Sequence, residues 1–138
     1  MGTTSYNTVM VIDDNDIDLF INKRVIEFSK FGENILTMQS AKDALQYLNS
    51  GKELPEVIFL DLNMPIMDGY GFLYEFEKFP EEIKTQISIF VLTSSDNDRD
   101  REKTAANPRV SKFVSKPLDD EKLTEIEEYM QHAKVGAQ

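Results

Sequence analysis

Five side chains with complementary chemistry each stand at the end of an apolar segment of the sequence: Asp13, Asp14, Asp61, Thr93 and Lys116. Three carboxylates brought together repel one another unless a cation neutralises them, and a hard divalent ion such as Mg²⁺, or Mn²⁺ in its place, suits that role. A threonine hydroxyl and a lysine ammonium both suit a phosphoryl oxygen. Asp61 then remains as the nucleophile, since aspartyl phosphates are known covalent intermediates. The set predicts phosphoryl transfer to Asp61.

These side chains can meet only if the strands that carry them end side by side. The apolar segments expected to form strands are residues 8–12, 34–38, 57–60, 87–92 and 110–114. Helices are expected over residues 16–31, 41–48, 69–79 and 98–106, and from about residue 118 onward. This alternation predicts an α/β fold, a flavodoxin-like doubly wound five-stranded parallel sheet in the order 2-1-3-4-5 with five helices. In that order the five side chains share one crevice at the carboxyl edge.

The first helix has apolar residues on two faces. The larger group, which we expect to face the core, is Ile17, Phe20, Ile21, Val25, Phe28 and Phe31. Gly32 is expected to cap this helix at its C-terminal end. Leu19 and Ile26 are one heptad apart on the opposite, solvent-facing side. They are either a chance occurrence or the place where a phosphodonor docks.

Composition narrows the classes of protein to consider. The 138 residues carry a net charge of −10, contain no cysteine and are 41% hydrophobic. One soluble cytoplasmic domain over residues 1–138 is expected, with its core within about 8–132 and short polar tails. The negative charge argues against direct binding to nucleic acid or anionic lipid, and no window approaches the roughly 18 apolar residues of a membrane span. The absence of cysteine excludes disulfides and thiol catalysis.

Several weaker motifs are better explained by structure than by chemistry. Asp14-Asn15-Asp16-Ile17-Asp18 imitates the start of a calcium loop but lacks the glycine at position six and the glutamate at position twelve. Asp16 is therefore expected to cap the first helix. His132 is expected on the surface. Four aromatic residues at helical spacing are expected to pack in the core: Phe72, Tyr74, Phe76 and Phe79.

The motifs around the five side chains resemble the receiver domain of bacterial two-component response regulators. The resemblance covers roughly residues 8–132, with every motif in order. Its motifs are Asp13-Asp14, Asp61 with Met64-Pro65 and Met67-Asp68-Gly69, Leu92-Thr93-Ser94, and Phe113-Val114-Ser115-Lys116-Pro117.

The resemblance implies a metal site. Asp61 would be the phosphoacceptor and would ligate Mg²⁺ directly together with Asp14 and the backbone carbonyl of Asn63. Asp13 would act on the metal through water.

The same resemblance implies a switch. Thr93 and Lys116 would hold the phosphoryl group, and Phe113 would change rotamer with it. Asn63 and Ser95 flank the phosphoryl site and would tune how long the group persists. The Lys116-Pro117 peptide bond is often cis in the family.

Taken together, the sequence predicts a single-domain response regulator, a phosphoacceptor with self-phosphotransfer and autodephosphorylation chemistry only. Its partners would be a sensor histidine kinase or histidine phosphotransfer protein and a downstream protein target. Three alternatives stay open at this point: a vestigial receiver that binds proteins without phosphorylation, a receiver cut from a longer regulator, and a small aspartyl phosphatase.

Overall fold

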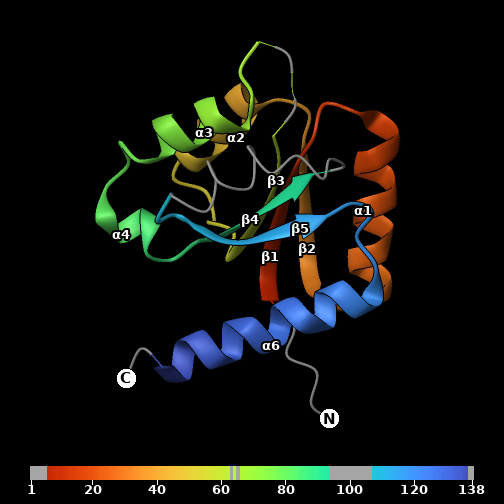
Figure 1. The fold of residues 1–138 in the computed structure, drawn as a ribbon. Coiled ribbons are helices and arrows are strands. Elements are labelled where there is room, and N and C mark those ends of the chain that lie inside the picture. Colours follow the sequence, from red (N-terminus) through yellow and green to blue (C-terminus); the bar gives the residue numbers. More distant parts are fainter. Residues whose placement is uncertain (1–5, 63, 65, 94–106, 137–138) are drawn as a thin grey trace.

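Five parallel strands form one twisted sheet in the order β2-β1-β3-β4-β5 (Figure 1). The computed structural model describes residues 6–62, 64, 66–93 and 107–136. The strands are β1 (Tyr6–Ile12), β2 (Gly32–Met38), β3 (Val57–Asp61), β4 (Ser88–Thr93) and β5 (Val110–Ser115). The predicted fold class and strand order are confirmed.

Five helices lie within the described part of the chain: α1 (Asp16–Phe28), α2 (Ala41–Leu48), α3 (Gly69–Phe76), α4 (Glu81–Lys84) and α6 (Asp120–Gly136). The short α4 was not expected, because Pro80 reads as the end of the preceding helix. In the structure, α4 begins directly after Pro80, which is the N-cap residue of α4. The helix expected over residues 98–106 lies outside the described residues.

The core has two layers because alternate residues of each strand point to opposite faces of the sheet. Val9 and Val11 of β1 pack against α1 and α6, whereas Met10 and Ile12 pack against α2 and α3. Figure 1 shows α1 well apart from α2 and α3, with one end of α6 close to α1. Helices therefore cover both faces of the central strands, and the carboxyl ends of the strands are where a parallel sheet of this kind places its chemistry.

Short polar side chains fix where the helices begin. The Asn15 side chain accepts a hydrogen bond from Asp18 N at 3.0 Å, and Ser40 accepts one from Asp43 N at 3.0 Å. Each satisfies a backbone N–H that has no partner within the helix. Ser40 is the N-cap of α2. The cap predicted at Asp16 is wrong by one residue, since Asn15 is the N-cap of α1.

The predicted orientation of α1 is wrong by half a turn. Leu19 and Ile26 are 6% and 0% exposed and lie in the core. Much of the group expected in the core faces solvent instead: Ile17, Phe20, Ile21 and Phe28 are 68%, 62%, 43% and 89% exposed. Leu19 and Ile26 therefore cannot form a docking surface.

The turn between β1 and α1 sets this orientation. Asp13 Oδ1 accepts a hydrogen bond from Asn15 N at 2.9 Å, and Asn15 in turn caps the helix. These two local bonds fix where the helix begins, and the face with Leu19 and Ile26 is the one that packs against the sheet.

The end of α1 also differs from the prediction. The helix stops at Phe28, and Lys30 makes the turn with a φ of 58°. Gly32 begins β2 and does not cap the helix. A Cβ on Gly32 would lie 2.6 Å from Val9 Cγ2, so glycine is needed there for close packing. Phe31 is buried as predicted, at 3% exposure, but it lies in the connection between α1 and β2 and not in the helix.

Among the aromatic residues expected in the core, Phe72 and Phe76 are fully buried and Phe79 is partly buried. Tyr74 is an exception. It is 67% exposed, and Lys78 Nζ lies 4.6 Å from the centre of its ring. His132 is exposed, as predicted.

Candidate functional site

Three carboxylates meet where β1 and β3 end. Ile12 pairs with Leu60 across the two strands, so the residues that follow them, Asp13 and Asp61, come together. One oxygen each from Asp13, Asp14 and Asp61 lies within 4.8 Å of the others. Asp13 and Asp61 are 1% and 4% exposed, whereas Asp14 is exposed. Two buried carboxylates and one open to solvent make a cluster of hard oxygen ligands that fits a divalent cation.

Lys116 reaches this cluster from the end of β5. Its Nζ lies 3.0 Å from Asp13 Oδ2, 3.4 Å from Asp61 Oδ1 and 3.4 Å from Asp18 Oδ2. Burial by itself would lower the pKa of Lys116. The hydrogen bond to Asp13 and the charges of Asp61, Asp13 and Asp18 outweigh burial and raise the pKa above its ordinary value. The side chain is therefore a fixed positive charge at neutral pH.

Thr93 is the last residue of β4, the strand that lies between β3 and β5. It is fully buried, and it pairs with Ser115 in the register of the two strands. Its carbonyl oxygen accepts a hydrogen bond from Lys116 N at 2.7 Å. The peptide bond from Lys116 to Pro117 is cis. The backbone thus ties the hydroxyl-bearing residue and the ammonium-bearing residue together at the sheet edge.

Phe113, the residue expected to act as a switch, is partly buried on β5. It lines a hollow of about 140 Å³ between β5 and α6, together with Lys122 and Ile126. The Phe113 ring therefore has open space beside it, at the surface where β5 and α6 meet.

Some predicted site residues lie outside the described part of the chain. These are Asn63, Ser94 and Ser95. The role of the Asn63 carbonyl at a metal and the tuning roles of Asn63 and Ser95 stay predictions.

Asp18 is a site residue that sequence reasoning missed. It lies one helical turn beyond Asp14, which places it on the side of α1 nearest the site. In the sequence, Asp18 reads only as part of a failed calcium motif. Its contact with Lys116 makes it a fourth carboxylate beside the one ammonium that the described residues place in this cluster. The imbalance strengthens the case for a cation at this edge.

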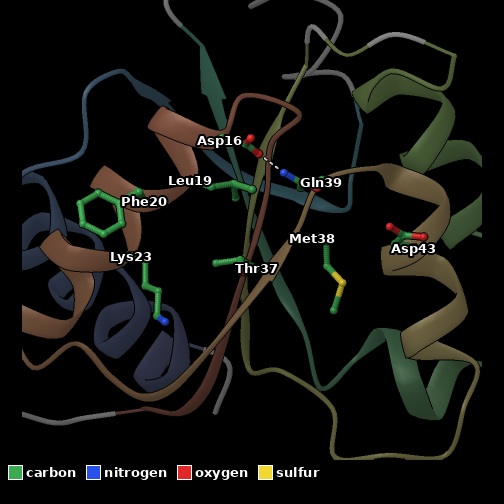
Figure 2. A pocket seen from close by; sticks show the side chains of 8 residues that line it. All are labelled: Asp16, Leu19, Phe20, Lys23, Thr37, Met38, Gln39 and Asp43. Carbon is green, nitrogen blue, oxygen red and sulfur yellow. Dashed lines mark hydrogen bonds between the residues drawn. The ribbon is translucent and has the colours of Figure 1, made fainter.

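Two hollows flank α1. One, of about 450 Å³, lies between α1, β2 and the start of α2 (Figure 2). Phe20 and Lys23 line it from α1, Met38 and Asp43 line it from across the gap, and the Asp16 to Gln39 hydrogen bond crosses one end (Figure 2). The second hollow, of about 370 Å³, lies between the last turns of α1 and the start of α6.

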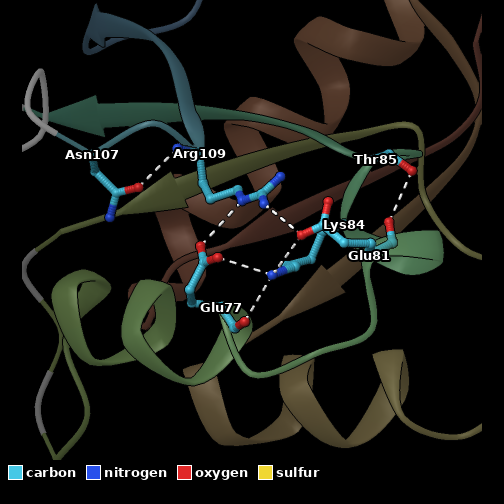
Figure 3. Close-up of polar contacts among 6 residues, drawn as sticks. All are labelled: Glu77, Glu81, Lys84, Thr85, Asn107 and Arg109. Carbon is cyan, nitrogen blue, oxygen red and sulfur yellow. Dashed lines mark hydrogen bonds and ion pairs between the residues drawn. The ribbon is translucent and has the colours of Figure 1, made fainter.

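A different charged cluster lies at the amino ends of β4 and β5 (Figure 3). Arg109 Nε and Nη2 contact Glu77 and Glu81 at 3.1 and 3.0 Å. Lys84 Nζ contacts the same two carboxylates at 2.9 and 3.0 Å. We call these four residues the amino-edge cluster. Its charges balance, and it ties the end of α3 and α4 to the residue that precedes β5.

Comparison with known proteins points in one direction. The profile described as response regulator receiver domain matches residues 9–128. The probable methanogenesis regulatory protein FilR2 of Methanothrix harundinacea is 31% identical over 129 residues, which cover 88% of this chain and 81% of that protein. The sensor histidine kinase CheAY of Helicobacter pylori is 28% identical over 118 residues, which cover 86% of this chain but only 14% of the kinase.

Solved structures agree with the sequence comparison. The crystal structure of a two-component response regulator from Cytophaga hutchinsonii superposes with a TM-score of 0.84 at 29% identity, covering 93% of this chain and 99% of that one. None of the described helices is long and apolar enough to cross a membrane.

Proposed function

This chain belongs to the response regulator receiver family, and we propose that it accepts a phosphoryl group from a phosphohistidine protein onto Asp61. The observation that carries the proposal is the buried position of Asp61 beside Asp13, with the Lys116 ammonium 3.4 Å from it. A carboxylate held this way is a nucleophile whose charge is partly compensated, so an anionic phosphoryl group can approach it.

The transfer needs few steps. An Asp61 carboxylate oxygen attacks phosphorus, the phosphorus–nitrogen bond to the donor histidine breaks, and the released imidazole takes a proton from solvent. Lys116 compensates the negative charge on the phosphoryl oxygens, and the Thr93 hydroxyl donates to one of them. Water later attacks phosphorus, which releases phosphate and restores the carboxylate. The chain itself turns over no external substrate.

Asp13, Asp14 and Asp61 are the residues that would hold Mg²⁺, or Mn²⁺ in its place. When bound, the ion neutralises charge on the phosphoryl oxygens. The acid cluster explains why this help is needed, because among the described residues four carboxylates gather around one ammonium, and their negative charge would otherwise repel a phosphoryl group.

Thr93 and Phe113 carry the signal outward in this proposal. Thr93 follows the phosphoryl group, and Phe113 changes rotamer toward the hollow beside α6. This shifts the population of conformations at the surface of β5 and α6, where a downstream protein binds.

The first experiment replaces the phosphoacceptor. Incubation of the protein with phosphoramidate and Mg²⁺ should add the mass of one phosphoryl group, measured by intact mass spectrometry. Asp61→Asn should abolish that gain while circular dichroism shows an unchanged fold. Labelling that persists in Asp61→Asn would contradict the proposal. Steady release of phosphate from added phosphate monoesters would favour a phosphatase, and no labelling of the wild type would favour a phosphorylation-independent binding module.

The phosphohistidine protein needs a surface next to Asp61, and we place it on α1. The exposed residues Ile17, Phe20, Ile21 and Phe28, named here the α1 stripe, lie along the outer side of this helix. Their spacing of three, four and seven residues is the spacing that receives a partner helix. The stripe begins at Ile17, just after the turn that holds Asp13 and Asp14. A helix laid along it reaches the acid cluster.

The stripe can be tested separately from the chemistry. Ile21→Asp combined with Phe28→Asp should slow phosphotransfer from a phosphorylated histidine kinase core by about tenfold or more, since it places charge in an apolar contact. Labelling by phosphoramidate should be unchanged. Tyr74→Asp is the matched control, because Tyr74 is equally exposed but lies on α3. Equal transfer to all three proteins would remove the stripe from the proposal.

A further inference from the structure

Ile66 combines two features that a folded protein does not favour. It is 107% exposed, the most exposed large apolar side chain among the described residues. Its φ is 68°, in the left-handed region that β-branched residues rarely adopt. Glycine or asparagine would satisfy this backbone with less strain, and a polar side chain would be better solvated.

The neighbours of Ile66 explain how it is held there. Met64 is 8% exposed and lies in the core layer under α2 and α3, and Met67 packs against the same layer. A Cβ on Gly69 would lie 2.8 Å from Leu62 Cα, so the connection folds back tightly on the end of β3. The Gly69 N–H donates to the Leu62 carbonyl oxygen at 3.0 Å. The segment is anchored on both sides, and Ile66 is forced outward.

Ile66 also lies in a particular place. Its segment directly follows β3, whose last residue is Asp61. It leads to α3 on one face of the sheet, whereas the turn after β1 leads to α1 on the other face. A protein that reaches Asp61 over this edge has the start of α1 on one side and the segment of Ile66 on the other.

We propose that Ile66 is an anchor that inserts into an apolar pocket of the phosphohistidine protein while that protein delivers its phosphoryl group to Asp61. The proposal rests on the proposed function and adds a specificity-determining residue to it. Exposure of the Ile66 side chain stabilises nothing in the free chain and becomes favourable when the side chain is buried in the complex, for which its constrained backbone already holds it outward. Contacts on both sides of Asp61 also restrict the angle at which the phosphohistidine approaches, which favours in-line transfer.

The test compares stability with phosphotransfer in the same variants. Ile66→Asn removes the apolar contact and relaxes the backbone, whereas Ile66→Val keeps both the apolar surface and the β-branch. The small donor is phosphoramidate with Mg²⁺. The protein donors are the purified histidine kinase cores and phosphotransfer domains of the same organism, phosphorylated beforehand, and the one that phosphorylates the wild type fastest is used throughout.

We expect Ile66→Asn to raise Tm and to lower kcat/KM for transfer from the protein donor by about tenfold or more. Labelling by phosphoramidate should stay within about twofold of the wild type, and Ile66→Val should behave like the wild type in every assay.

Three results would overturn the inference. They are wild-type transfer to Ile66→Asn, an equal loss with phosphoramidate, and a Tm that does not rise. Failure of the proposed function is distinct, because it would be a wild-type protein that phosphoramidate does not label at Asp61 or that no protein donor phosphorylates.

Discussion

Two charged clusters lie at opposite ends of the same sheet, and they are built by opposite rules. At the amino edge, Glu77 and Glu81 face Lys84 and Arg109, so two negative charges meet two positive ones. At the carboxyl edge, Lys116 is the only cation among the described residues that contacts the acid cluster: it pairs with Asp13, Asp18 and Asp61, and Asp14 lies beside them. The charges of the amino-edge cluster balance, whereas within the described residues those of the carboxyl-edge cluster are in negative excess.

Exposure accentuates this difference. The carboxylates of the amino-edge cluster are open to water, with Glu77 and Glu81 side chains 51% and 66% exposed. Asp13 and Asp61 at the carboxyl edge are almost completely buried. Solvent screens the first pair and does little for the second. Like charges that are buried close together point to a functional site, because their mutual repulsion costs stability that packing alone would not require.

The largest expected effect comes from removing the Lys116 ammonium at the carboxyl edge. Lys116→Met leaves the buried Asp13 without its 3.0 Å partner. We expect a loss of about 2 kcal/mol in the free energy of unfolding in metal-free buffer, measured by urea denaturation. Added Mg²⁺ should restore part of it, since the ion supplies the missing positive charge.

Arg109→Met is the matched control for that variant at the amino edge. It leaves Glu77 and Glu81 in contact with Lys84 and with water. Tm should fall by no more than about 4 °C, and Mg²⁺ should not change the effect. An equal loss in the two variants would contradict the distinction between the clusters.

Neutralising one acid in each cluster should change Tm by an intermediate amount. The change should be an increase at the carboxyl edge and a decrease at the amino edge. Asp14→Asn relieves repulsion in the carboxyl-edge cluster and should raise Tm by about 2 °C in metal-free buffer. Glu81→Gln removes the carboxylate charge that pairs with both Lys84 and Arg109, and it should lower Tm.

Magnesium distinguishes the same pair of variants. The increase in Tm that Mg²⁺ causes in the wild type should be smaller in Asp14→Asn and unchanged in Glu81→Gln. A fall in Tm for Asp14→Asn would show that the carboxyl-edge cluster is not frustrated.

The carboxyl edge could be predicted from the sequence because its residues are tied to strand ends. An apolar segment that stops at Asp61, and another that stops at Thr93, determine both the strand and the side chain at its end. Parallel pairing then brings such ends together, and the register of Ile12 with Leu60 does this for the acids. The fold class and the meeting of Asp13, Asp14, Asp61 and Lys116 followed from local patterns.

The orientation of α1 could not be predicted in the same way. Both faces of the helix carry apolar residues, and periodicity favoured the side with Ile17 and Phe20. The side with Leu19 and Ile26 is buried because the turn through Asp13 and Asn15 sets the angle at which the chain enters the helix. The apolar side left outside became the α1 stripe.

The amino-edge cluster was missed for a different reason. Arg109 is 32 residues away from Glu77 in sequence, and no local pattern connects them. Lys84 is almost fully buried although lysine is usually a surface residue. The pairing depends on where α3, α4 and β5 meet in space, and this is decided by the packed sheet.

The smallest expected effect concerns how the amino-edge cluster responds to pH. Hydrogen bonds from Lys84 and from Arg109 lower the pKa of Glu77 below its ordinary value of 4.5. A carboxyl group whose pKa is lower in the folded chain stabilises the fold above its unfolded pKa, and the stabilisation is lost as the pH falls through the folded pKa. The Tm of Glu77→Gln should therefore lie slightly below that of the wild type at pH 7, and the two should converge as the pH falls below 4.5.

Glu82→Gln is the control for this pH series, because Glu82 lies on the same short helix but makes none of the four ion pairs of the amino-edge cluster. Its Tm should follow that of the wild type across the range, measured by thermal unfolding at closely spaced pH values. A difference between wild type and Glu77→Gln that stays constant down to pH 3 would mean that the Glu77 side chain acts through packing. The amino-edge cluster would then be held together by contact and not by charge, and its contrast with the carboxyl edge would concern burial alone.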